Sequence, residues 1–259
     1  NPGQPGLNQT WDFSNLVAAG YDSIYYINPS QAPGYQNFPS ANIATKHNPL
    51  SYPNGYNVNF WNYSSANIKG IADESLINIF GDFYMAFHVH YLPPSANLDF
   101  PIDYGDSKSQ NFVIDWFTAT RSGGMTTDTA RTISHVALNC NVDGAGTMIL
   151  PGGSFQVLRV KVVFNTTDSG FTWNGSGWVF ANTSTNTWTQ YRWYAKNHGE
   201  VGFYGPGSKD ADGFTFFHSQ TLTGMSDLEA LRNIIVFPNP TTTFLTVSPG
   251  DHVSKIEVL

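Results

Sequence analysis

The chain has few of the charged residues that usually cover a soluble protein. Asp, Glu, Lys and Arg make up 12% of its 259 residues, against about 25% in an average globular domain. Asn, Ser, Thr and Gly must therefore cover most of the exterior. Cys140 is the only cysteine, so an intrachain disulfide is excluded. Because Cys140 lies in an apolar, alternating run, we expect it to be a small buried side chain.

Two further absences exclude whole classes of function, and the first residue bears on export. The 12 basic residues are scattered and the net charge is −7, whereas nucleic-acid binding requires clustered Lys and Arg. No apolar run approaches the length of about 20 residues that a membrane-spanning helix requires. The first residue is Asn1 rather than Met, and we expect that a signal peptide has been removed.

Apolar residues alternate with period two over most of the chain, which is typical of half-buried strands. One strand runs from Phe83 to Tyr91, and another contains Leu158 to Phe164. Turn residues at 143–146 and 151–153 divide the stretch 133–164 into three strands of an antiparallel meander. We therefore predict an all-β fold, an antiparallel β-sandwich of jelly-roll or immunoglobulin-like type. Residues 27–57 are rich in Pro, Asn, Tyr and Gly and predict long ordered loops.

The C-terminal part of the sequence has a different organisation. Ser226–Arg232 is the one good helix candidate, with Ser226 and Glu229 spaced as in a capping box. An apolar run then ends in Val236 and Phe237, and Pro238, Asn239 and Pro240 follow. The two prolines fix an extended elbow, because each restricts both itself and the residue before it. A strand-like alternation follows at 244–248.

This C-terminal stretch resembles the start of the C-terminal sorting domain of the type IX secretion system. The segments 143–160 and 6–14 likewise resemble parts of the large N-terminal regions of type IX cargo proteins. The resemblance implies a cargo domain at 1–225, a short helical connector at 226–233, and the first strands of an immunoglobulin-like sorting domain at 234–259. Val236 to Pro240 would then be recognised by the export machinery.

The same resemblance implies partners and a location. The partners are the outer-membrane translocon of the type IX system and its β-barrel shuttle. The protein would be secreted to the cell surface or the medium of a Gram-negative bacterium. Type IX cargo domains of this kind have no assigned activity as a class, so the function of residues 1–225 has to be argued from its own residues.

His88 and His90 are the candidate metal ligands. They lie two residues apart on the predicted strand, so both imidazoles share one face and could bind the same metal. The Glu that follows the second His in cupin-like patterns is missing. We therefore favour two ordinary sheet histidines and expect no metal centre. Structural calcium is a minor alternative at 141–144 and 210–213, where Asp-Gly pairs are more typical of turns.

Acidic residues suitable for catalysis are sparse. A glycoside hydrolase needs two carboxylates that face each other across a cleft, yet glutamate occurs only at positions 74, 200, 229 and 257. Asp103, Asp106 and Asp115 could replace them, although their spacing singles out no pair. A hydrolase of extracellular polymers, using such aspartates or a metal at His88 and His90, is the alternative function.

Tryptophan is concentrated in one polar stretch, at Trp173, Trp178, Trp188 and Trp193. Tryptophan rings stack on the apolar faces of sugars, and their N–H groups bind hydroxyls. The competing interpretation places half of these rings in the core. We expect a non-catalytic extracellular binding protein with a glycan as the favoured ligand and no assigned catalytic residue. A purely structural surface component is the third hypothesis.

Overall fold

The computed structural model describes residues 2–17, 23–47, 55–81, 83–96, 98–123, 125–196, 198–206, 212–216, 235–237 and 246–248. The chain divides into two compact units, Asn1–Gln220 and Thr221–Leu259. Among the described residues, no helix is long and apolar enough to cross a membrane.

The described residues form strands and two short 3-10 turns, in the following order. The elements of the first unit are β1 (Gly6–Asp12), β2 (Ile24–Ile27), η1 (Pro29–Gln31), η2 (Tyr35–Asn37), β3 (Ile43–His47), β4 (Tyr56–Tyr63), β5 (Ile68–Phe80), β6 (Phe83–Ser95), β7 (Ser107–Ser122), β8 (Met125–Leu150), β9 (Gly153–Trp173), β10 (Trp178–Ala195), β11 (Gly199–Pro206) and β12 (Asp212–Phe216). The second unit contains β13 (Ile235–Phe237) and β14 (Thr246–Ser248).

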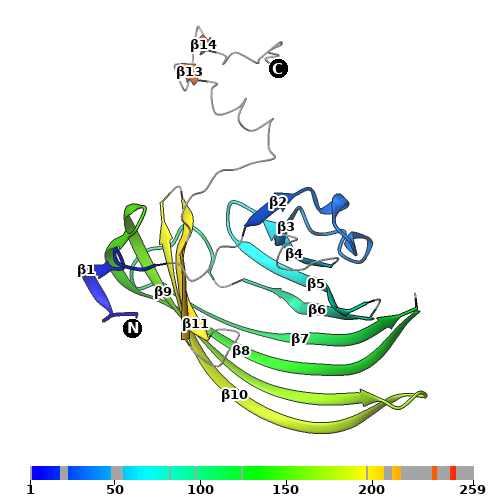
Figure 1. The fold of residues 1–259 in the computed structure, drawn as a ribbon. Coiled ribbons are helices and arrows are strands. Elements are labelled where there is room, and N and C mark those ends of the chain that lie inside the picture. The colour runs from blue at the N-terminus through cyan, green and yellow to red at the C-terminus, as the bar shows by residue number, and fades with distance from the viewer. Residues whose placement is uncertain are drawn as a thin grey trace. The chain divides into compact units, whose positions relative to one another are not determined.

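One 12-stranded sheet makes up the first unit. Strands β2 to β12 pair with their neighbours in chain order, all antiparallel, and β1 alone joins in parallel beside β8. The long strands β7 to β10 bend strongly along their length, so that the sheet curls into a half-barrel (Figure 1). The predicted all-β antiparallel class is thus confirmed. A single curled sheet forms the fold.

The alternation along β8 decides which face of the sheet is buried. Val136, Leu138, Cys140 and Val142 are buried, whereas the residues between them are exposed. These four side chains pack with residues of β7, β9 and the β6–β7 loop, namely Leu98, Phe112, Val160 and Val162. Cys140 is buried as predicted, and burial raises the pKa of its thiol to about 11. We call this surface the core face.

The core face is the concave side of the half-barrel. Burial, with Tyr26 and Glu200 nearby, raises the pKa of Tyr63. Tyr63 ends β4 and Glu200 lies on β11, and six strands separate β4 from β11 in the sheet order. The two residues can interact electrostatically only because the sheet curls between them.

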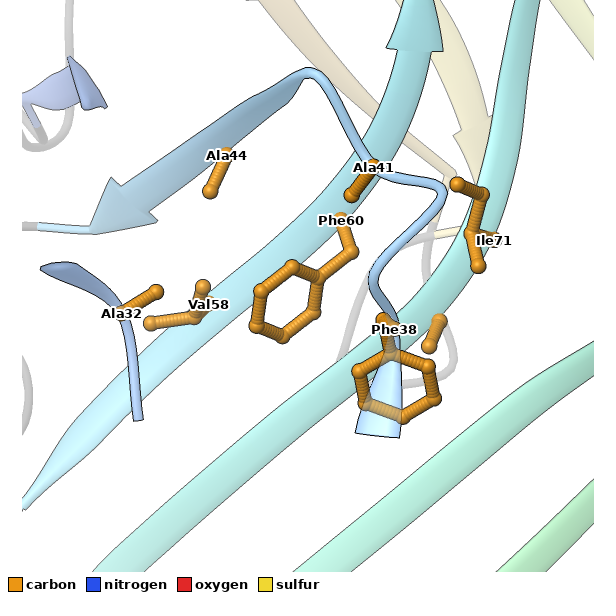
Figure 2. Close-up of a cluster of buried hydrophobic side chains, with 8 residues drawn as sticks. Ala32, Phe38, Ala41, Ala44, Val58, Phe60 and Ile71 are labelled. Carbon is orange, nitrogen blue, oxygen red and sulfur yellow. The ribbon is translucent and has the colours of Figure 1, made fainter. Parts of the chain in front are cut away.

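A second cluster lies on the opposite face, at the β2–β5 end of the sheet. Phe60 and Val58 of β4 are fully buried under the segment that carries the two 3-10 turns. Phe38 from this segment stacks against Phe60 with ring centroids 5.0 Å apart. Figure 2 shows the two rings beside Ala41 and Ile71. Of residues 27–57, predicted as long ordered loops, the part from 28 to 42 covers the sheet, whereas Ile43–His47 forms strand β3 and strand β4 begins at Tyr56, so the prediction is wrong there.

The third cluster holds the N-terminus of the chain in place. Trp11 of β1 and Trp193 of β10 meet edge to face at 6.1 Å, and Phe13 also contacts Trp193. Beneath Trp11 lies Arg159, whose side chain is 1% exposed. Arg159 donates two hydrogen bonds to Asp143 and two more to the carbonyl oxygens of Pro2 and Gly3.

The predicted turn at 143–146 is wrong. Strand β8 continues through it to Leu150, with only a shift of register between Val142 and Gly144. The glycines are needed there because β1 approaches closely: a Cβ on Gly146 would lie 1.9 Å from the carbonyl oxygen of Gln9. The turn at 151–153 is confirmed, since Leu150 pairs with Gly153 across it.

The second unit contains one described feature. β13 pairs antiparallel with β14, so the residues before and after the Pro-Asn-Pro elbow form a two-stranded ladder. Val236 and Phe237 belong to β13. The other residues of the expected recognition segment, Pro238 to Pro240, lie outside the described residues, as does the predicted helix Ser226–Arg232.

Candidate functional site

An open groove of about 740 Å³ crosses five neighbouring strands, β6 to β10. Its two walls are rows of cross-strand partners. One row joins Val113, His135, Thr167 and Thr185, and the other joins Asn111, Ala137, Asn165 and Thr187. Paired residues point to the same face of a sheet. The residues between the rows, such as Val136 and Thr166, are buried on the core face. The groove therefore lies on the other surface, which we call the groove face.

The groove is lined by both polar and apolar residues, none of which carries a formal charge. The polar ones are Asn and Thr residues and one histidine, and the apolar ones are Leu92, Pro93, Phe112, Val113, Val136 and Ala137. Thr187 Oγ1 donates a hydrogen bond to the side-chain amide oxygen Oδ1 of Asn165 at 2.9 Å. Just outside, Ser109 donates one to Asn139 at 2.7 Å. Such amides have further donors and acceptors free to bind a ligand rich in hydroxyl groups.

An aromatic group lies on the same face, towards the β9–β10 hairpin. It consists of Phe117, Phe171, Trp173, Trp178 and Phe180. Trp173 and Trp178 meet at 5.3 Å, and Trp178 also contacts Phe117 at 6.1 Å. Phe180 is 58% exposed and Trp173 is 39% exposed. Exposed aromatic surface of this kind marks interaction sites.

The aromatic group and the groove are parts of one continuous surface. Along β9, Trp173, Phe171, Ser169, Thr167 and Asn165 occupy alternate positions and so point to the same side. Trp173 lies six positions after Thr167 along β9, a span of about 20 Å. A ligand of several linked units could therefore touch both.

One ion pair lies between the two parts. Arg131 donates hydrogen bonds from Nε and Nη2 to the two carboxylate oxygens of Asp115, at 2.9 and 2.8 Å. The guanidinium also lies 4.8 Å from the centre of the Phe117 ring. The paired carboxylate raises the pKa of Arg131. This arrangement fixes Arg131 while leaving part of it exposed to a ligand.

The four predicted tryptophans occupy three different environments. Trp173 and Trp178 belong to the aromatic group on the groove face. Trp188 stacks on Phe164 at 5.0 Å, with the ring planes 11° apart, on the core face. Trp193 is fully buried. The ring of Trp193 therefore belongs to the core and offers no surface to a glycan.

His88 and His90 share a face, as their spacing predicts, but have different partners. His88 Nδ1 is hydrogen-bonded to the buried carboxylate of Glu74, which raises the pKa of His88. His90 packs edge-on against Phe38 at 5.0 Å. Within the described part of the chain, no three His, Cys, Asp or Glu side chains gather as a metal site would require.

The three aspartates considered for hydrolysis lie in two places: Asp103 and Asp106 share one turn, and Asp115 lies on β7. Asp115 is held by Arg131, whereas Asp106 accepts a hydrogen bond from the backbone N–H of Asp103 in an exposed turn. Asp143, part of one candidate calcium loop, has both carboxylate oxygens bound to Arg159. Asp210, which begins the other, lies outside the described residues.

A partly buried carboxyl on the core face was not recognised from the sequence. Asp73 accepts hydrogen bonds from Tyr91 Oη and from Asn59 Nδ2, each at 2.6 Å. Burial raises the pKa of Asp73, and these two bonds partly oppose the effect. The network continues from Asn59 through Thr45 to Trp61. Both oxygens of Asp73 therefore have partners. Through Thr45, Asn59, Asp73 and Tyr91, these hydrogen bonds link the four neighbouring strands β3 to β6.

No protein-family model, curated protein or solved structure gave a match to this chain.

The groove could not have been found from the sequence. Its lining residues are spread from Leu92 to Thr187, and only the register of five strands brings them together. One local signal was present: threonine occupies every second position from Thr183 to Thr189. Such a polar alternation on a strand predicts a solvent-facing row, although it names no ligand.

Proposed function

We propose that residues 1–225 form a non-catalytic binding protein for an extracellular, electrically neutral glycan chain. One observation carries the proposal: the exposed aromatic group and the amide- and hydroxyl-lined groove lie on the same face of the sheet. Aromatic rings bind the apolar faces of sugars, and the groove supplies donors and acceptors for their hydroxyls. The lining of the groove contains no Asp, Glu, Lys or Arg, which favours a neutral ligand over a charged one.

Replacing exposed rings should weaken this binding without loosening the fold. Trp173→Ala and Phe180→Ala are each expected to weaken binding of a neutral polysaccharide by about tenfold or more, since a buried aromatic anchor contributes about 2 kcal/mol. Their urea midpoints should stay near that of the wild type, because both rings are substantially exposed. Glycan-array screening followed by titration calorimetry measures the effect.

The matched control lies on the core face. Trp188→Ala also removes a tryptophan ring, from the same strand as Phe180 but from the opposite side of the sheet. It should leave glycan affinity unchanged, apart from an effect of lower stability. If no glycan binds the wild type, or if the exposed-ring variants bind as well as it does, the glycan proposal fails and the structural-component hypothesis gains.

We also propose that the protein reaches its ligand by type IX export. The support is the resemblance of the Pro-Asn-Pro segment, together with the β13–β14 ladder that flanks it. The division of the chain after Gln220 also agrees with a separate C-terminal module.

Export should depend on that module. When residue 234 and everything after it is deleted from the encoded protein, a type IX-competent host is expected to retain the protein in the cell. Immunoblots of the medium, the cell surface and the periplasm check this. Replacing the exposed Trp173 instead, with the C-terminal part intact, should leave the amount exported unchanged. Quantitative export of the deleted form would refute the route.

A further inference from the structure

The outer edge of β10 has no partner along most of its length among the described residues. β10 pairs with β9 from Trp178 to Ala195, but with β11 only from Tyr191 to Ala195. Figure 1 shows β10 at the lower margin of the sheet, with β11 crossing only near one end. The backbone N–H and C=O groups that point outward from this edge can accept another strand.

The usual features that block such an edge are scarce here. Natural edge strands carry charged residues, prolines or bulges that prevent pairing with another chain. The sequence of 178–190, WVFANTSTNTWTQ, contains no charged residue and no proline. The register shift between Phe180 and Asn182 is the one irregularity of its pairing with β9. From Asn182 onward the edge is regular and uncharged.

This edge is complementary to itself. The residues Asn182-Thr-Ser-Thr-Asn186 read the same in both directions around Ser184. If two copies pair antiparallel about a twofold axis through Ser184, Asn182 lies opposite Asn186, and Thr183 lies opposite Thr185. Cross-strand threonine pairs are favourable, and no like charges face each other. Residues 182–190 carry no charge themselves, and the carboxylate of Asp168 on the neighbouring strand β9 accepts hydrogen bonds from Ser184 and Asn186.

We propose that a second copy of this chain pairs with β10 through residues 182–186, forming a twofold-symmetric dimer with a continuous sheet. Such an interface uses the same patch on both copies. The groove reaches this edge, because Thr185, Asn186 and Thr187 are among its lining residues. Pairing therefore brings two grooves together along one face. The association itself requires no glycan, so its test is independent of the proposed function.

The test places charges on the symmetry axis. Sedimentation velocity of the full chain, without added glycan, should show a concentration-dependent dimer. Ser184 is exposed, and the twofold axis sets it opposite its own copy. Ser184→Lys and Ser184→Glu are each expected to weaken dimerisation by about fivefold or more, because two like charges then face each other. Mixing the two variants in equal amounts should restore a dimer, since opposite charges then meet.

Control variants separate this edge from other surfaces. Thr167 is the cross-strand partner of Thr185 and is also exposed, but it lies on β9, which is paired on both sides. Thr167→Lys should dimerise as the wild type does. Urea midpoints equal to that of the wild type establish that the Ser184 variants are folded. A monomeric wild type, a dimer unaffected by both Ser184 variants, or a mixture that fails to associate would each overturn the proposal.

Discussion

Arg159→Ala is expected to lower the free energy of unfolding by about 3–5 kcal/mol, the range for breaking one side of a buried ion pair. The guanidinium is 1% exposed and Asp143 is 11% exposed. Removing the cation leaves the carboxylate of Asp143 without either of its two hydrogen bonds. The carbonyl oxygens of Pro2 and Gly3 lose their donor at the same time. Urea unfolding followed by tryptophan fluorescence measures the loss.

Arg131→Ala is the matched control for this prediction. Arg131 makes the same two-point contact with Asp115, but its side chain is 29% exposed. Water can replace the lost bonds there, so we expect a loss of about 1 kcal/mol or less. If the two substitutions cost the same, burial is not what makes the Arg159 pair important.

Trp193→Ala is expected to cost a similar amount, about 3–5 kcal/mol, because it empties a fully buried site. The ring contacts Trp11, Phe13 and Phe214. These partners come from β1, from the residue after it, and from β12, so the cavity would loosen both ends of the first unit together. Thermal or urea unfolding of the full chain measures this loss.

Two further variants show whether packing is the cause. Trp193→Phe keeps most of the ring and removes the indole N–H, which has no hydrogen-bond partner among the described residues. It should therefore cost much less than the alanine variant. Trp173→Ala removes an exposed ring and should change stability little. Equal losses for Trp193→Ala and Trp173→Ala would contradict the assignment of Trp193 to the core.

The four tryptophans between 173 and 193 show how much a sequence pattern can predict in this protein. They fall in one polar stretch, and the pattern does not indicate which rings contact a glycan and which belong to the core. The structure places Trp173 and Trp178 on the groove face, Trp188 on the core face and Trp193 in the interior. Position along the sequence could not separate them, because burial depends on which distant segment covers each part of β9 and β10.

The same limit applies to the predicted turn at 143–146. Asp-Gly and Ala-Gly are typical of turns, so the local pattern predicts a turn. In the structure these glycines admit Gln9 and Trp11, which are more than a hundred residues away in the sequence. Asp143 is held by Arg159 rather than by its own turn. A contact between residues so far apart leaves no trace in the local pattern.

By itself the sequence determined the strand content, the burial of Cys140, the hairpin turn at 151–153 and the strands on both sides of the Pro-Asn-Pro elbow. These features follow from alternation and from the conformational preferences of Pro and Gly, which act over a few residues. The tertiary structure alone decided the groove, the aromatic group beside it and the edge of β10 that has no partner among the described residues. Each of these depends on strand register and on the curl of the sheet, which are set by hydrogen bonds and packing between residues far apart in the chain.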